Sequence, residues 1–150
     1  MSHSPYSYKR LDAHRYIFVS KGRKNIEKAV DFVPLGIRNI LNFGFGDLLP
    51  DGSIDDTVNS NNGDITIVLS TVVEILKDFT WEFPQAEIYF SGSTIERTRL
   101  YTRIIKTYYA SFSREFVITA FNTKNDGIQQ VIFDPMVKED YLGFLIKRIN

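Results

Sequence analysis

The sequence predicts an α+β fold: a mostly antiparallel, twisted sheet of five to six strands, with two long helices on one face and a short helix at the C-terminus. Three observations indicate this. Runs of β-branched and aromatic residues come first along the chain, with no helical segment between them. Two long segments then repeat apolar residues at three- and four-residue steps, the spacing of amphipathic helices. Strands and helices do not alternate strictly, so a parallel α/β sheet is not expected.

Length and composition indicate one folded domain. The chain has 150 residues, of which 43% are hydrophobic, and this is enough to bury an ordinary core. Because the N-terminal segment is polar, we divide the chain into a flexible arm, 1–14, and a single α+β domain, 15–150. The arm lacks the apolar stretch of a signal peptide, and no apolar run is long enough to span a membrane. A cytoplasmic protein with no membrane partner is therefore expected.

Charge and residue content exclude some classes of function. The 18 basic and 18 acidic residues balance, so the whole chain has no net attraction to nucleic acid or to an anionic membrane. The absence of cysteine excludes disulfides, thiolate metal sites and cysteine nucleophiles. Both histidines, His3 and His14, lie in the arm, so we expect neither a histidine-centred triad nor a zinc site inside the fold. No metal site is assigned.

Three strands are expected in the first part of the domain. They cover 15–20, 28–33 and 38–47, where β-branched and aromatic residues are bounded by glycine or proline. In the third strand apolar and polar side chains alternate, which indicates one exposed face. The spacing of the three segments is that of an antiparallel meander.

The connection that follows is long and acidic. Residues 47–64 contain five aspartates and neither lysine nor arginine. An unstructured loop of this length is uncommon in a compact domain. Either a short hairpin lies around Asp51-Gly52, or the loop has a function. Its oxygen ligands suit a hard cation, but their order is not that of an EF-hand.

The two long helices are predicted at 65–82 and 94–113. Asp64 stands at the N-cap position of the first, where its carboxylate would accept from free backbone amides. Ser93 and Glu96 fit a capping box at the start of the second. The other predicted elements are strands at 87–91, 116–121 and 130–133, a turn around 125–127, and a short helix at 139–149. The side chains expected to be mostly buried are Leu69, Val72, Leu76, Phe79, Ile88, Phe90, Leu100, Ile104, Tyr108, Val117 and Val131.

The start of the second helix is the strongest candidate for a functional site. It combines a glycine that lets a ligand approach the backbone, two hydroxyl residues, free backbone amides and two arginines that suit a phosphate or carboxylate. Arginine in a first helical turn opposes the helix dipole, so an anion is expected nearby. The alternative is a purely structural cap, with an arginine paired to an aspartate of the preceding loop. The predicted anion-binding residues are Gly92, Ser93, Thr94, Arg97 and Arg99.

We expect this site to be shared with the start of the first helix. Both helix starts should lie on the same face of the sheet, so the acidic loop and the arginines would meet in one polar concavity. The residues expected at its polar rim are Asn61, Asn62, Asp64 and Tyr101.

A set of short motifs also suggests a family. The chain reads F-G-D at 45–47, D-D at 55–56, S-N-N-G-D at 60–64 and G-S-T-x-x-R-T-R-L-Y at 92–101. As a set, these motifs resemble those of a family of small uncharacterised bacterial proteins of about this length, whose function is unassigned. The resemblance implies a bacterial, cytoplasmic, single-domain protein, and it assigns no catalytic or binding residue to this chain.

The residues leave three functions open, and they identify neither a cofactor nor an oligomeric state. The first is a binding module for an anionic, phosphate-bearing ligand or nucleic acid, in which Arg99, Arg103 and Lys106 form either a basic stripe or an ordinary solvated face. The second is a protein–protein interaction partner in a bacterial regulatory or defence system, suggested by small size, neutral charge and abundant tyrosine and phenylalanine. The third, ranked last, is an enzyme acting on a phosphorylated or nucleic-acid substrate.

Overall fold

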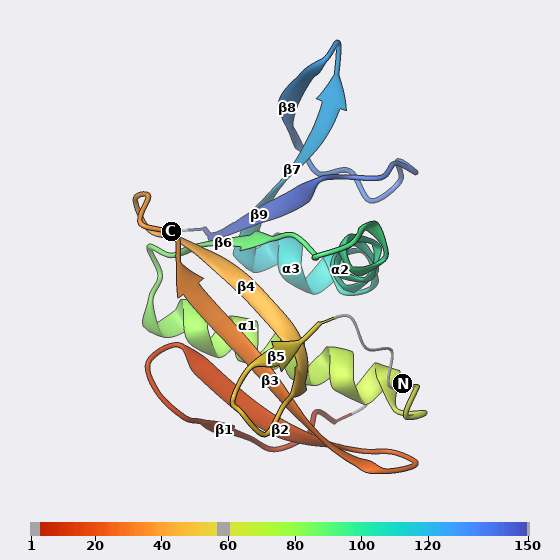
Figure 1. The fold of residues 1–150 in the computed structure, drawn as a ribbon. Coiled ribbons are helices and arrows are strands. Elements are labelled where there is room, and N and C mark those ends of the chain that lie inside the picture. The colour runs from red at the N-terminus through yellow and green to blue at the C-terminus, as the bar shows by residue number, and fades with distance from the viewer. Residues whose placement is uncertain (1–3, 57–60, 150) are drawn as a thin grey trace. The chain divides into compact units, whose positions relative to one another are not determined.

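Figure 1 shows the computed structural model, which describes residues 4–56 and 61–149. The protein is α+β and its strands are mostly antiparallel, as predicted. The described residues form nine strands and three helices, more strands than the five to six expected. The chain divides into two compact units: a first unit, Met1–Val33 with Gly44–Phe83, and a second unit, Pro34–Phe43 with Pro84–Asn150. Strand β4 contributes residues to both.

The first unit contains strands in the order β1-β2-β3-β4, a short strand β5 against β4, and helix α1. The β1–β2, β2–β3 and β4–β5 pairs are antiparallel. The bounds of these elements are β1 Tyr8–Arg10, β2 Arg15–Lys21, β3 Asn25–Pro34, β4 Ile40–Leu48, β5 Ile54–Asp55 and α1 Ile65–Glu82.

Helix α1 has the bounds that its apolar spacing predicts. Its buried face includes Leu69, Val72 and Leu76, and the ring of Phe79 stacks on that of Phe32 in β3 with the centroids 3.9 Å apart. Asp64 stands at the N-cap position, but its side chain makes no capping hydrogen bond. The capping role expected for this carboxylate is therefore wrong.

Strand β1 lies in the segment predicted to be a flexible arm. Tyr8 pairs with Phe18 and Arg10 with Tyr16 in β2. The backbone N–H of Tyr6 donates to the hydroxyl of Thr71 at 2.8 Å. This part of the arm thus forms hydrogen bonds with β2 and α1, while the flexibility expected for 1–14 stays a prediction. His3 lies outside the described residues.

The acidic connection contains the short hairpin that the sequence left as one alternative. Strand β5 pairs with the end of β4, so that Asp47 is opposite Asp55. Gly52, at a φ of 88°, forms the turn, a conformation that glycine adopts without strain. Residues 57–60, which include the first residue of the S-N-N-G-D motif, lie outside the described part of the chain.

The second unit contains strands in the order β4-β6-β9-β7-β8 and the helices α2 and α3. The β4–β6 pair is parallel, and the other pairs of this unit are antiparallel. The bounds of the further elements are β6 Glu87–Phe90, α2 Ile95–Thr107, α3 Tyr109–Glu115, β7 Phe116–Lys124, β8 Gly127–Ile132 and β9 Gly143–Arg148.

The second predicted helix is in fact two helices. α2 ends at Thr107 and α3 begins at Tyr109, with Tyr108 between them at φ −106° and ψ 20°. β-branched and aromatic residues have low helix propensity because the helix restricts their side chains, and three of them follow one another here. The expectation that both long helices lie on one face of the sheet stays a prediction, since α1 and α2 belong to different units.

The predicted C-terminal helix is wrong, because this segment contains strand β9 between β6 and β7. Phe144 and Ile146 are 0% and 1% exposed, and Ile146 lies opposite Ile88 on one side and Ile118 on the other. The apolar residues of this segment fit either period. A central place in the sheet pairs the backbone on both sides and buries alternate side chains, which favours the strand.

Most of the predicted core is confirmed. Seven of the residues named are buried, and Leu100, Tyr108 and Val131 are half-buried. Val117 is 52% exposed, so its predicted burial is wrong. The strand is displaced by one position from the expected alternation, with Phe116 and Ile118 facing the core instead.

Candidate functional site

The start of α2 is capped one residue later than predicted. Thr94 is the N-cap residue, with extended backbone at φ −133°, and its side chain accepts a hydrogen bond from the N–H of Arg97 at 3.2 Å. Ser93 therefore precedes the cap, and the capping box built on Ser93 and Glu96 is wrong. Thr94 itself satisfies one of the amides that an anion would use.

Gly92 packs against this helix start. Its N–H donates to the Thr98 hydroxyl at 3.0 Å, and a Cβ built on Gly92 would lie 2.6 Å from the Thr98 nitrogen and closer still to the Cβ of Arg97. The close backbone approach that glycine permits is thus made by the first turn of α2. This accounts for the glycine without a ligand.

The two arginines have different surroundings. The Arg99 guanidinium forms two hydrogen bonds with the Asp140 carboxylate, at 2.9 and 2.8 Å, and both side chains are about half exposed. This pairing raises the pKa of Arg99 and lowers the pKa of Asp140. The Arg97 guanidinium lies 6.0 Å from the ring centroid of Tyr101. Tyr101 is 1% exposed, so it belongs to the core of the second unit and not to a polar rim.

The other predicted rim residues lie in the first unit, where they hold a loop. Asn62 is buried, and its amide group donates to the carbonyl of Lys24 at 2.8 Å and accepts from the N–H of the same residue at 2.8 Å. The Asp64 carboxylate accepts from the hydroxyls of Ser20 at 2.5 Å and Tyr6 at 2.6 Å. Asn61 has a φ of 44°, which asparagine tolerates better than most residues. A concavity shared between these residues and the start of α2 stays a prediction.

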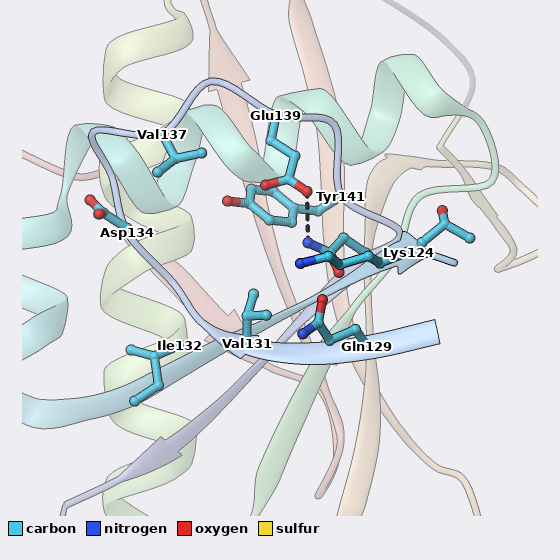
Figure 2. Close-up of a pocket in the computed structure, with 10 residues that line it drawn as sticks. Lys124, Gln129, Val131, Ile132, Asp134, Val137, Glu139 and Tyr141 are labelled. Atoms are coloured by element: carbon cyan, nitrogen blue, oxygen red, sulfur yellow. Dashed lines mark hydrogen bonds between the residues drawn. The ribbon is translucent and has the colours of Figure 1, made fainter. Parts of the chain in front are cut away.

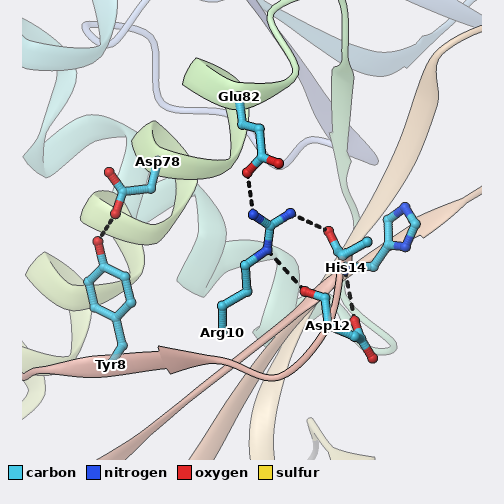
Figure 3. A network of polar contacts seen from close by, with 7 residues as sticks. Tyr8, Arg10, Asp12, His14, Asp78 and Glu82 are labelled. Carbon is cyan, nitrogen blue, oxygen red and sulfur yellow. Dashed lines mark hydrogen bonds and ion pairs between the residues drawn. The ribbon is translucent and has the colours of Figure 1, made fainter.

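A polar network attaches β1 to α1 in the first unit (Figure 3). The hydroxyl of Tyr8 donates to Asp78, and the guanidinium of Arg10 donates to Glu82 and to two backbone carbonyls of the following turn. Burial, and then the bond to Asp78, raises the pKa of Tyr8. We assign this network to the fold, because each charged group in it faces a partner from the neighbouring element.

A pocket of about 500 Å³ opens in the second unit (Figure 2). It lies between the β7–β8 hairpin and the loop that leads to β9. The Asn122 side-chain amide donates to Glu139 at 2.7 Å and ties this loop to the hairpin. The pocket is lined by Asn122, Thr123, Lys124, Gln129, Val131, Ile132, Asp134, Val137, Glu139 and Tyr141. Its two carboxylates and single lysine do not form a site for an anion.

The hairpin beside this pocket ends in an exposed edge strand. β8 pairs with β7, and no other strand among the described residues pairs with it. Ile128 and Ile132 are 73% and 81% exposed. Between Gly127 and Ile132 the strand has no charged residue and no proline, which are the usual means of protecting a sheet edge. An uncharged strand edge with exposed isoleucines is typical of a surface that pairs with another chain.

The register shows which backbone groups of β8 face outward. Asn125 and Asp126, with φ of 53° and 61°, form a two-residue turn, so Lys124 and Gly127 are a hydrogen-bonded pair. Every second residue from Gly127 then bonds to β7, and the N–H of Phe133 accordingly donates to Ile118. The outward-facing groups belong to the residues between these, Ile128, Gln130 and Ile132.

Sequence reasoning did not identify this edge as a site. It expected the strand at 130–133 rather than 127–132, because it took only the most apolar part of the run. The run G-I-Q-Q-V-I is uncharged and rich in β-branched residues, which is the available signal. Its position at the edge depends on β9, which sequence reasoning took for a helix.

Two further features are absent from the residues that the structure describes. These residues contain no helix long and apolar enough to cross a membrane. Nor do residues 4–56 and 61–149 bring together three histidine or carboxylate side chains in an arrangement that would hold a metal ion.

Comparison with known proteins gives a family and no activity. No curated protein matches the chain, and no solved structure matches it. Residues 2–149 match a family described as "Family of unknown function (DUF6934)". The match covers nearly all of the 150 residues, and the resemblance seen in the sequence motifs to a small uncharacterised family is thereby confirmed. The chain belongs to the DUF6934 family, whose function is unknown.

Proposed function

We propose that this chain is a protein-binding module that adds an extended segment of another polypeptide to the edge of its sheet at β8. The observation that carries the proposal is the state of this edge: an uncharged strand, free of proline, with Ile128 and Ile132 at 73% and 81% exposure. An edge of this kind favours association, and a stable monomer normally carries lysine, proline or a bulge there. The proposal keeps the protein-interaction role that small size and neutral charge also suggest.

The partner would be bound by backbone hydrogen bonds and by every second side chain of β8. Ile128, Gln130 and Ile132 offer N–H and C=O groups to a new strand, and hydrogen bonds of this type give affinity without demanding a particular sequence. Their side chains lie on one face of the sheet, so a partner with apolar residues at every second position would cover the two isoleucines.

The other face of the same edge supplies a second element of specificity. Gln129 and Val131 point to this face and line the pocket together with Asp134 and Glu139. A partner side chain on this face would lie beside two carboxylates, so a basic or hydrogen-bond-donating group suits it best. Binding of an anionic ligand at the start of α2 stays a prediction, since Thr94 and Asp140 already satisfy part of what an anion would contact.

Hydrogen exchange measured by NMR tests the proposal with a defined probe. The probe is a synthetic peptide that alternates valine and threonine and carries a lysine at each end. In the monomer without peptide, the amides of Gln129 and Val131 are protected by β7, whereas those of Ile128, Gln130 and Ile132 exchange fast. With peptide, we expect the three outward amides to become protected. Outward amides that exchange equally fast with peptide, and at every protein concentration, would refute strand addition.

Proline substitution at neighbouring positions gives a matched control. Gln130→Pro removes an outward N–H and leaves the pairing with β7 intact, so it should abolish peptide protection and keep the fold. Gln129→Pro removes an inward N–H and should destabilise the hairpin. The Gln130 side chain also donates to the hydroxyl of Thr119 at 2.9 Å. Gln130→Ala removes this bond alone and should still bind the peptide.

A further inference from the structure

Resting on the proposed use of β8 for strand addition, we infer that its partner is β8 of a second copy of this chain. The two strands would run antiparallel about a two-fold axis at Gln130. In this arrangement Gln130 faces Gln130 of the other copy, and Ile128 faces Ile132 of the other copy. The five strands β4-β6-β9-β7-β8 of each copy would then form one continuous sheet through the interface.

The outward backbone groups are arranged to fit this pairing. They belong to Ile128, Gln130 and Ile132, which are spaced evenly about Gln130. A two-fold axis at Gln130 therefore brings outward groups opposite outward groups at all three positions, and each such pair exchanges two hydrogen bonds. If the axis lay at Gln129 or Val131 instead, only two of the three outward residues of each copy would face an outward residue of the other copy. Only the register centred on Gln130 thus lets all three outward residues form hydrogen bonds across the interface.

The exposed side chains fit the same register. In an antiparallel pair, residues directly opposite each other point to the same face of the sheet. Ile128 and Ile132 would therefore contact each other across the interface, once on each side of the axis. These are the two apolar side chains of β8 that the isolated chain leaves 73% and 81% exposed. Apolar pairs of this kind stabilise a sheet, and covering them removes the aggregation hazard of an open edge.

The charges near β8 predict how the affinity of the dimer depends on salt concentration. The strand itself is uncharged, so no ion is buried when two copies meet. Beyond its ends, Asp126 would lie opposite Asp134 of the other copy, and both are exposed. Like charges placed opposite each other weaken a strand pair, and salt screens them. The dimer should therefore become tighter as the salt concentration rises. Asp126→Asn should tighten it at low salt, because asparagine accepts the φ of 61° at this position.

Cysteine cross-linking tests the register. The native chain has no cysteine, so any disulfide that forms must involve the cysteine that has been introduced. Opposed residues of a hydrogen-bonded antiparallel pair have Cα atoms about 5.5 Å apart, within the roughly 4.4–6.8 Å that a disulfide spans. Gln130→Cys should form a disulfide dimer on mild oxidation. Ile128→Cys should not link to itself but should link to Ile132→Cys when the two proteins are mixed.

Light scattering during size exclusion measures the native state. We expect the native chain to elute with the mass of a dimer, and Ile132→Lys, a change at an exposed position, to elute as a folded monomer. A native chain that is monomeric at every concentration and salt, with no Gln130→Cys disulfide, would overturn the second copy as partner. If the valine–threonine peptide still protects the outward amides of that monomer, strand addition stands and self-pairing alone fails. If the peptide gives no protection either, both proposals fail.

Discussion

Alanine substitutions along β9 distinguish a central strand from the helix that the sequence suggests. Ile146 is 1% exposed and lies between Ile88 and Ile118. Ile146→Ala removes three carbon atoms, which at about 0.8 kcal/mol each gives a transfer cost of about 2.4 kcal/mol. The cavity left in a central strand that is paired on both sides adds to this, so we expect a loss of about 2–5 kcal/mol in the free energy of unfolding.

The matched control is the neighbouring residue, Leu145, which points to the opposite face and is half-buried. Leu145→Ala should cost roughly half of the transfer term, about 1 kcal/mol. A helix would instead place Leu142, Leu145 and Ile149 on one buried face, although Leu142 and Ile149 are 43% and 51% exposed. Urea denaturation followed by circular dichroism measures both variants. A larger loss for Leu145→Ala than for Ile146→Ala would refute the strand.

Three further predictions concern the start of α2 and the β1–α1 contact. Gly92→Ala should destabilise the chain in urea denaturation by about 1–3 kcal/mol, because the added methyl group meets the backbone of α2; an unchanged midpoint would show that this contact yields easily. If the start of α2 binds an anion, inorganic phosphate should raise the melting temperature of the native chain and not of Arg97→Ala, whereas equal shifts would reject the site. The native state raises the pKa of Tyr8 above its ordinary 10.0, so the stability this group contributes is complete below pH 10 and is lost as the pH rises through the folded-state pKa. Tyr8→Phe should therefore lose less stability than the native chain between pH 9 and pH 11, and equal losses in urea denaturation at the two pH values would contradict this.

Local patterns in the sequence are sufficient to predict several elements of the fold. The bounds of α1 follow from apolar residues at helical spacing over five turns, a pattern too long for a strand. The strands around Phe18, Phe32 and Phe43 follow from β-branched and aromatic runs ended by glycine or proline. The hairpin near Gly52 was one of two alternatives, because a turn signature is local while its pairing is not.

At the candidate site, the sequence placed hydroxyl and arginine residues at a helix start, but it could not assign their partners. The cap is Thr94 rather than Ser93, and the anion beside Arg99 is Asp140, which is 41 residues further along the chain. An ion pair between residues so far apart in the chain produces no local spacing pattern from which it could be predicted. The positive φ of Asn125 and Asp126, by contrast, agrees with the turn that the sequence predicts.

The identity of β9, and through it the site at β8, depends on long-range pairing within the fold. The apolar segment 142–149 fits a helix or a strand, since Leu142, Leu145 and Ile149 have helical spacing while Phe144 and Ile146 have the two-residue spacing of a strand. Its place between β6 and β7 supplies backbone partners on both sides. These long-range hydrogen bonds stabilise the extended conformation over the helical one. With β9 in the centre, β7 is covered and β8 becomes the edge. The exposure of Ile128 and Ile132 is therefore a consequence of strand order, which no local pattern encodes.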